Sequence, residues 1–173
     1  MSASPPPSDP SPVEPVSPVE PPSPVERSRD QIERSEILLP GGNITPVSRA
    51  GDTVRRASGP WTPTIHRLLS HIRDRGIDWA PEALGTDGLG REVLSFLPGT
   101  VPHYPLPPEV WSDATLDAAG WMLRALHDAT LDFDDAAASW QQPVHEPAEV
   151  ICHNDFAPYN FVFEGVRLTG VID

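Results

Sequence analysis

Residues 152–160, Cys-His-Asn-Asp-Phe-Ala-Pro-Tyr-Asn, combine side chains that can do chemistry together. They fit the pattern H-x-D-x-x-x-x-N, in which His153 is followed by Asp155 and Asn160. Phosphoryl transfer needs a carboxylate that orients the attacking hydroxyl and accepts its proton, and Asp155 is placed for that role. It also needs oxygen ligands for Mg²⁺, and Asn160 can supply one. The spacing therefore predicts a catalytic Asp155 and a metal-binding Asn160.

A predicted hairpin after Asn160 brings a second carboxylate to the same place. Residues 161–172 have the pattern of a strand, a glycine-containing turn and a returning strand. The chain then comes back to the end at which the hairpin began, and Asp173 lies near Asn160 and Asp155. Two carboxylates and an amide at one place are suited to a magnesium-bound nucleotide. Asp173 is therefore the second predicted metal ligand.

Two neighbours of Asp155 have structural interpretations. Residues 150–152 are predicted to form a short buried strand, so we expect Cys152 to be buried and inert. His153 is interpreted as a hydrogen-bonding residue that holds the loop, because the aspartate carries the chemistry in this pattern. A metal-dependent phosphohydrolase that uses His153 and Asp155 is an alternative function.

The elements that must position this loop start with a small β-rich region. Three short strands are predicted as an antiparallel meander at 36–39, 44–49 and 53–56. A helix follows, with Thr62 as its N-cap, Pro63 in its first turn and Gly76 as its stop. Its buried face is predicted from the helical spacing of four residues, Ile65, Leu68, Leu69 and Ile72.

A second strand pair, at 82–84 and 91–97, precedes a proline-rich connector over residues 100–111. A long helix is expected from about Asp113 to Thr130. Its spacing predicts a buried stripe of six residues, Leu116, Ala119, Gly120, Leu123, Leu126 and His127. The five tryptophans are interpreted as packing residues of the core or the linker; they are Trp61, Trp79, Trp111, Trp121 and Trp140.

Residues 150–163, together with Gly170-Val-Ile-Asp173, resemble the aminoglycoside phosphotransferase and choline kinase superfamily. Residues 91–99 are similar to its inter-lobe hinge, and residues 121–130 to the helix that precedes its catalytic loop. The resemblance implies an α+β, protein-kinase-like fold of two lobes. It implies a nucleotide-binding N-terminal lobe with the hinge at 35–99, and the start of a helical C-terminal lobe at 100–173. Because the chain ends within the pattern, we expect this second lobe to be incomplete.

The family uses ATP and Mg²⁺ to phosphorylate small-molecule hydroxyls, so the resemblance implies these cofactors and a small-molecule alcohol as substrate. Asn154 and Ala157 stand where protein kinases carry arginine and lysine, which favours a small-molecule acceptor. By matching positions, Ser95 and Leu97 offer backbone groups to the adenine. A turn over the phosphates is implied for Gly41, Gly42 and Asn43.

The chain departs from this family at its phosphate-binding cation, because it contains no lysine. Arg55 is the predicted substitute on the third strand, with Arg56 on the opposite strand face as the alternative. The two arginines could instead be an ordinary surface pair. The predicted helix at 63–75 has no glutamate to pair with that cation, and it carries His66 and His71 instead.

Composition limits the remaining possibilities. The 173 residues include 23 prolines and one cysteine, and the formal net charge is −13. This acidic balance argues against nucleic acid as a partner, a single cysteine is typical of a reducing, cytoplasmic setting, and no apolar run predicts a membrane span. Residues 1–34 form a Pro/Ser/Glu-rich segment that we expect to be a disordered tail. It could bind a partner, so a non-catalytic nucleotide- or partner-binding protein is the alternative to a kinase.

Overall fold

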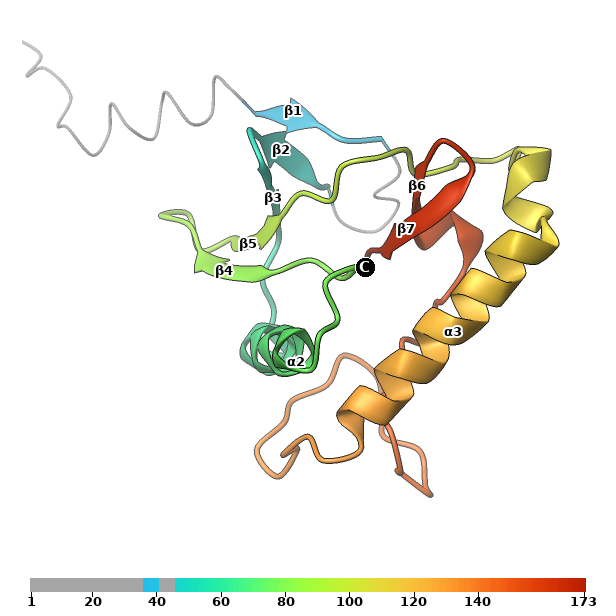
Figure 1. Cartoon of the computed structure of the whole chain (residues 1–173). Coiled ribbons are helices and arrows are strands. Elements are labelled where there is room, and N and C mark those ends of the chain that lie inside the picture. Colours follow the sequence, from blue (N-terminus) through green and yellow to red (C-terminus); the bar gives the residue numbers. More distant parts are fainter. Residues whose placement is uncertain (1–35, 41–45) are drawn as a thin grey trace, which may run out of the picture.

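The computed structural model describes residues 36–40 and 46–173, and over these the fold is α+β. Within them a five-stranded antiparallel sheet has the order β1-β2-β3-β5-β4 (Figure 1). Its strands are β1 Ile37–Leu38, β2 Ser48–Ala50, β3 Thr53–Arg56, β4 Ala83–Thr86 and β5 Glu92–Ser95. The predicted meander and second strand pair are therefore confirmed; β3 has the predicted bounds, and the bounds of the other strands differ from the predicted ones by one to four residues. The proposed tail and the turn at Gly41, Gly42 and Asn43 lie outside the described residues.

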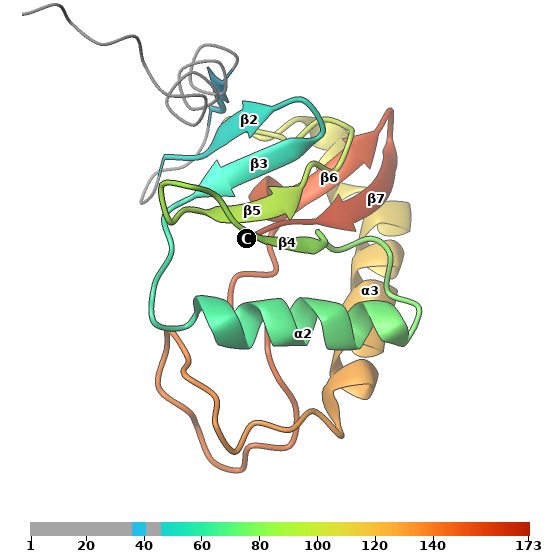
Figure 2. The same cartoon turned by 90° about the vertical axis from the view of Figure 1, so that its left-hand side faces the viewer.

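The register of β3 decides where its two arginines point. In the antiparallel pairing of β3 with β5, Arg56 lies opposite Glu92 and Arg55 lies opposite Val93. Successive side chains of a strand point to opposite faces of the sheet, so the side chains of Arg55 and Arg56 lie on different faces and have different neighbours. Figure 2 shows β3 and β5 side by side, with the C-terminus of the chain close to the sheet.

The first long helix, α2, covers Thr62–Asp74 and runs alongside the sheet (Figure 2). It ends as predicted at Gly76, which has a φ of 84° and lets Ile77 N–H donate back to the Ile72 carbonyl at 3.1 Å. Its beginning differs from the prediction. Trp61 is the N-cap, and Thr62 is the first helical residue, whose hydroxyl accepts a hydrogen bond from Gly59 N–H.

The second long helix, α3, covers Asp113–Thr130, as predicted, and follows the short 3₁₀ helix η1 Pro108–Trp111. Ser112 caps it by accepting a hydrogen bond from Thr115 N–H at 3.2 Å. The predicted buried stripe was wrong in part, because Leu116 is 72% exposed and Gly120 is exposed as well. The helix packs instead through a neighbouring face, Thr115, Met122, Leu126, Ala129 and Thr130.

The predicted hairpin is confirmed as β6 Phe161–Glu164 and β7 Arg167–Val171. It follows the 3₁₀ helix η2 Pro158–Asn160 and lies against α3 (Figure 1). Thr100, just after the hinge-like segment, exchanges two backbone hydrogen bonds with Phe163, of 2.8 and 2.9 Å. The hairpin is therefore fixed both to α3 and to the segment that leaves the five-stranded sheet.

The expectations for residues 150–152 and for two of the tryptophans need correction. Residues 150–152 form no strand, and Cys152 is exposed, because the chain there crosses the surface between α3 and the hairpin. Trp111 and Trp121 are 65% and 64% exposed, so they are not core residues.

Among the described residues, no helix combines the length and apolar character needed to cross a membrane.

Candidate active site

The loop before η2 holds Asp155 through its own neighbours. Asn160 Nδ2 donates to the backbone carbonyl of Asp155 and to its Oδ2, both at 2.9 Å. Tyr159 Oη donates to the other carboxylate oxygen, Oδ1, at 2.5 Å. This bond to a charged acceptor raises the pKa of the Tyr159 phenol. Asn160 is buried and Asp155 is exposed, so a fixed amide holds a carboxylate that faces solvent.

Asp173 is brought to this loop by the hairpin, as predicted. The residue before it, Ile172, donates its N–H to the Asn160 carbonyl at 2.9 Å, and its own carbonyl lies 3.2 Å from His153 Nε2. His153 thus has a structural contact that ties the loop to the end of the hairpin. Asp173 has a φ of 85°, a backbone conformation that is uncommon for residues other than glycine.

Arg56 connects the five-stranded sheet to Asp173. Its Nη1 donates to Asp173 Oδ1 at 3.0 Å, and its Nε donates to Glu92 Oε2 at 2.5 Å. Within the described part of the chain, its Nη2 makes no hydrogen bond. Of the two candidates for the missing lysine, the structure therefore places Arg56 beside the predicted metal ligand.

Glu92 is the most deeply buried carboxylate of this group. It is 2% exposed, and its Oε1 lies 3.1 Å from His66 Nε2 of α2. A buried carboxylate is costly unless charged or hydrogen-bonding groups surround it, and here Arg56 and His66 approach its two oxygens from different elements. The chain therefore does supply a carboxylate partner for an arginine on β3, from β5 rather than from the helix.

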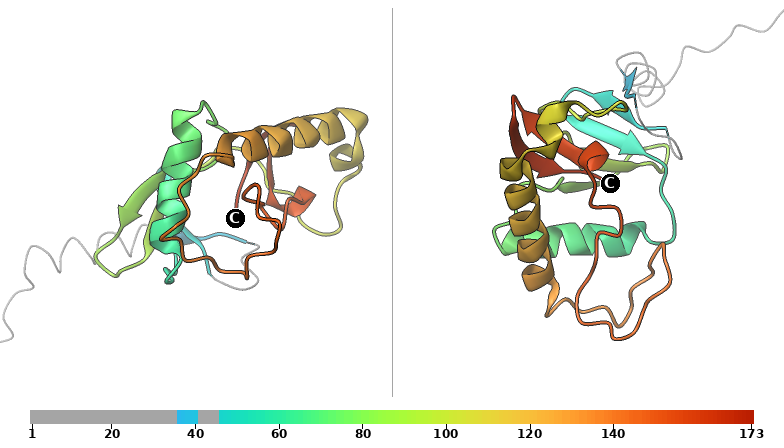
Figure 3. Two further views of the ribbon diagram at one scale, coloured as in Figure 1. Left: turned by 90° about the horizontal axis from the view of Figure 1, so that it is seen from below. Right: turned by 90° about the vertical axis from the view of Figure 1, so that its right-hand side faces the viewer.

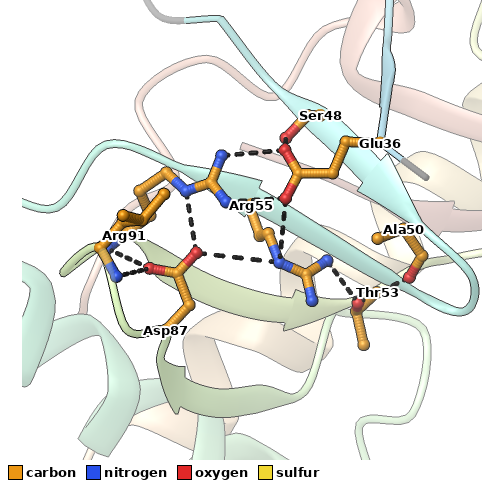
Figure 4. A network of polar contacts seen from close by, with 8 residues as sticks. Glu36, Ser48, Ala50, Thr53, Arg55, Asp87 and Arg91 are labelled. Carbon is orange, nitrogen blue, oxygen red and sulfur yellow. Dashed lines mark hydrogen bonds and ion pairs between the residues drawn. The ribbon is translucent and has the colours of Figure 1, made fainter. Parts of the chain in front are cut away.

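Arg55 lies in a different network, shown in Figure 4. Its Nε is 3.5 Å from Glu36 Oε1 and 3.8 Å from Asp87 Oδ2, and its Nη1 donates to Thr53 Oγ1 at 2.9 Å. Arg91 bridges the same two carboxylates, with hydrogen bonds of 2.7 to 2.9 Å. The structure thus surrounds Arg55 with carboxylates and does not bring it to Asp173, so its phosphate role stays a prediction.

The Arg91 network changes the acidity of its members. Hydrogen bonds from Arg91 lower the pKa of Glu36 below its ordinary value of 4.5. Burial raises the pKa of Asp87, but hydrogen bonds from Arg91 and from the Leu89 backbone outweigh it, and the net pKa lies below 3.8. Both carboxylates are therefore negatively charged at neutral pH and form ion pairs with Arg55 and Arg91.

The two residues predicted to contact the adenine, Ser95 and Leu97, differ in whether their backbone groups are already hydrogen-bonded. Ser95 already donates its N–H to the Glu82 carbonyl at 2.9 Å, and its hydroxyl accepts the Glu82 N–H at 2.8 Å. The backbone of Leu97 has no such partner among the described residues. Leu97 also lies next to the hairpin, because a Cβ on Gly170 would come within 2.9 Å of Leu97 Cδ1. Leu97 is thus the freer of the two.

A magnesium ion fits the residues present only in a particular way. Within residues 36–40 and 46–173, no three His, Cys, Asp or Glu side chains gather in a way that could hold a metal ion. Mg²⁺, however, is commonly held by one or two protein oxygens together with water and substrate phosphates. Both hydrogens of the Asn160 amide point to Asp155, which leaves Oδ1 as its ligand atom, and Asp173 offers a carboxylate. This donor set fits Mg²⁺ carried by a nucleotide.

A groove of the described surface lies elsewhere. Its volume is about 390 Å³, and it is lined at the end of α2 and along α3 by Arg75, Gly76, Ile77, Trp79, Trp121, Ala125, Asp128 and Ala129. None of the predicted site residues lines it. In the left view of Figure 3, seen from below, the C-terminus of the chain is framed by α2, α3 and the long loop that follows α3, and the right view shows it at the level of the strands.

Sequence reasoning missed Glu92 and Tyr159, and it named His66 only as a residue of the helix that lacks a glutamate. Glu92 meets Arg56 only through the pairing of β3 with β5, and His66 lies against Glu92 only through the packing of α2, so no local pattern predicts either contact. Tyr159, in contrast, stands within the recognised motif, four residues after Asp155. That spacing in a tight loop could have indicated a side-chain contact between the two.

Comparisons with known proteins find similarity in the segment that contains the Asp155 loop and the hairpin. The sequence model of the "Phosphotransferase enzyme family" matches residues 107–173, which include α3, the Asp155 loop and both strands of the hairpin. The "Trifolitoxin immunity protein" of Rhizobium leguminosarum bv. trifolii is 40% identical over 145 residues, which cover 80% of this chain and 54% of that protein. The chain thus spans about half the length of this curated relative. The resemblance noted in the sequence is therefore confirmed: residues 107–173 match the sequence model of the phosphotransferase enzyme family.

Proposed function

We propose that this protein is an ATP-dependent phosphotransferase that phosphorylates a small-molecule hydroxyl. One observation carries the proposal: Arg56 of the five-stranded sheet contacts Asp173, and the residue before Asp173 is hydrogen-bonded to Asn160, which in turn holds Asp155. A cation, two carboxylates and an amide from opposite parts of the chain thus meet at one place. This is the set of groups that phosphoryl transfer requires. In this proposal the arrangement is the site of a two-lobe, kinase-like fold.

In this proposal Asp155 orients the acceptor hydroxyl and accepts its proton. Asn160 fixes Oδ2 of Asp155, so the other oxygen, Oδ1, faces the acceptor. Tyr159 donates to Oδ1, and its hydroxyl therefore occupies the position of a hydroxyl donor. An acceptor alcohol takes the place of the Tyr159 hydroxyl when it binds, because both compete for the same carboxylate oxygen.

The nucleotide is held by residues of both parts of the chain. Asn160 Oδ1 and the Asp173 carboxylate would hold Mg²⁺, which when bound neutralises the charge of the phosphates. Arg56 would direct Nη2, which makes no hydrogen bond within residues 36–40 and 46–173, to phosphate oxygens, since guanidinium groups bind phosphate through parallel N–H donors. The backbone of Leu97 would bind the adenine. The proposal also includes an adenine contact from the backbone of Ser95 and a turn over the phosphates formed by Gly41, Gly42 and Asn43.

The test is transfer of the γ-phosphate, followed by ³¹P NMR with Mg²⁺, ATP and a panel of small-molecule alcohols. The relative is an immunity protein against a toxin by name, so toxins with free hydroxyls form a second class in the panel. Asp155→Asn is expected to lower the transfer rate by about 10²- to 10⁴-fold, the usual contribution of a general base. Asp117→Asn, on the exposed face of α3, is the matched control and is expected to keep the rate.

A non-catalytic nucleotide-binding protein is the alternative, and the absence of lysine is the observation that favours it. It predicts ATP binding without transfer to any acceptor and with equal affinity in Asp155→Asn. If the proline-rich segment serves as a binding element for a partner, deletion of residues 1–30 abolishes capture of that partner while ATP binding stays. Transfer that depends on Asp155 would contradict this alternative.

A further inference from the structure

We infer that Glu92 is the positioning residue for Arg56: it aims the guanidinium at the nucleotide phosphates, while His66 of α2 lies against the other oxygen of Glu92. The inference rests on the proposed function, because it concerns the cation of the same site. It assigns a role to a strand residue and a helix histidine whose contacts the proposed reaction does not otherwise use.

The burial of Glu92 is the first argument. A carboxylate that is 2% exposed is stable only when charged or hydrogen-bonding groups face it. Arg56 Nε faces Oε2 at 2.5 Å, and His66 Nε2 lies 3.1 Å from Oε1. Arg56 on β3 therefore holds Oε2 through a hydrogen bond, whereas His66 on α2 only lies close to Oε1, since neither atom of that second contact has a hydrogen-bond partner within the described residues.

The geometry of the guanidinium is the second argument. Arg56 uses Nε for Glu92 and Nη1 for Asp173, and two contacts at different nitrogens define both the place and the plane of the group. The remaining nitrogen, Nη2, has no hydrogen bond within the described residues and is free for a phosphate oxygen. Without the Glu92 carboxylate, the guanidinium could turn and offer two N–H groups to Asp173, which would occupy the proposed metal ligand.

The origin of Glu92 is the third argument. In protein kinases the phosphate-binding lysine on a strand is paired with a glutamate from a helix. Here α2 contains no glutamate, and the carboxylate comes from β5, directly opposite Arg56 in the sheet register. Because β3 and β5 are neighbouring strands, this ion pair is fixed by backbone hydrogen bonds of the sheet. The helix contributes only the secondary contact of His66.

The test compares affinities for ATP and for adenosine, measured by calorimetry in the presence of Mg²⁺. Glu92→Gln keeps the shape of the side chain and removes its charge. We expect its ATP affinity to fall by at least about tenfold, the equivalent of one hydrogen bond to a charged group. Its adenosine affinity should change by less than about twofold, because adenosine has no phosphate for Arg56 to bind. A purely structural role for Glu92 would weaken both ligands equally and would overturn the inference.

Glu36→Gln is the matched control. Glu36 is also a mostly buried carboxylate paired with an arginine of β3, with a side chain that is 11% exposed, but its partner Arg55 lies away from Asp173. Both affinities are expected to stay within about twofold of the unmodified protein. An equal loss of ATP affinity in Glu36→Gln and Glu92→Gln would overturn the inference, because it would make the effect a general consequence of removing a buried charge.

A double-mutant cycle shows whether Glu92 acts through Arg56. Arg56→Met is expected to weaken ATP binding, and Glu92→Gln added to it should cause no further loss. Additive losses would contradict the inference. If Glu92→Gln does not fold, His66→Gln replaces it, because that side chain is 21% exposed. It should weaken ATP a few-fold and leave adenosine unchanged; unchanged ATP affinity would overturn the inference. An unmodified protein that binds no ATP would overturn the proposed function as well.

Discussion

At the scale of single residues, Asp155 is held by two neighbours that act differently. Asn160 fixes one carboxylate oxygen from a buried position, so it sets the geometry of the group. Tyr159 donates to the other oxygen from the loop itself, and in the proposed reaction it has to leave for an acceptor to bind. The same loop thus supplies both the support for the proposed catalytic carboxylate and a competitor for one of its oxygens.

The contact between Tyr159 and Asp155 predicts a change in the acidity of the phenol. Asp155 raises the pKa of Tyr159 above its ordinary value of 10.0, because the carboxylate accepts the phenolic hydrogen and opposes a second negative charge. Asp155→Asn should therefore lower this pKa. Ultraviolet difference spectroscopy of a pH titration measures it, and Tyr159→Phe assigns the transition, since the chain has two tyrosines. An unchanged titration midpoint in Asp155→Asn would refute the contact.

At the scale of elements, the Arg91 network fastens β1 to the turn between β4 and β5. Glu36 lies just before β1, and Asp87 lies just after β4, so Arg91 connects the first described strand to the far edge of the sheet (Figure 4). Both carboxyl side chains are more than four-fifths buried, with 11% and 13% exposed. Such a network contributes more than an exposed ion pair, because solvent screens it less.

Arg91→Met is expected to lower the free energy of unfolding at pH 7 by about 2–3 kcal/mol, because it leaves two buried carboxylates without their main partner. The lowered pKa values of Glu36 and Asp87 give the pH dependence. Their stabilising contribution is complete above the ordinary values of 4.5 and 3.8 and is lost as the pH falls through the lowered values. The difference in the free energy of unfolding between Arg91→Met and the unmodified protein should therefore shrink as the pH falls below 4.5. Denaturant unfolding at several pH values measures it, and a difference that stays constant below pH 4.5 would contradict this prediction.

A second prediction at this scale concerns the contact between the hinge-like segment and the hairpin. A Cβ on Gly99 would lie 2.6 Å from Val162 Cγ1 and 2.7 Å from the Phe163 carbonyl oxygen, and the φ of Gly99 is 141°. Val162 is 1% exposed and has no room to move. Gly99→Ala should therefore lower the free energy of unfolding by about 1–3 kcal/mol.

Gly120→Ala is the matched control for this substitution. Gly120 lies on the exposed face of α3, and a Cβ added to it would meet no atom within 4 Å, so alanine should raise the free energy of unfolding by about 0.5–1 kcal/mol. Urea denaturation of both variants checks the pair. Equal effects of the two substitutions would mean that the close approach at Gly99 has no energetic weight.

At the scale of the whole molecule, the sequence predicted those features that depend on residues close together in the chain. The end of α2 at Gly76 and the bounds of α3 follow from residues next to them in the chain. The buried face of α3 could not be predicted, because apolar residues occupy more than one of its faces and the packing partner selects between them. The hairpin that brings Asp173 to Asn160 was predictable from its own turn.

The partners of Arg56 show the opposite limit. Glu92 lies 36 residues further along the chain and Asp173 lies 117 residues further, so their contacts with Arg56 depend on strand register and on the packing of the hairpin against the sheet. Sequence reasoning could offer Arg55 and Arg56 as alternatives, because adjacent strand residues face opposite ways, but it had no means to choose the face. The fold makes that choice.

The central claim is that Arg56, Asn160, Asp155 and Asp173 form one nucleotide site that uses magnesium. Calorimetry of ATP binding with and without Mg²⁺, on the unmodified protein and on Asp173→Asn, tests it most directly. The account predicts that the unmodified protein binds ATP in a Mg²⁺-dependent manner and that Asp173→Asn loses this dependence, with an affinity at least about tenfold weaker. Mg²⁺-dependent binding of equal strength in both proteins, or no binding by the unmodified protein, would contradict it.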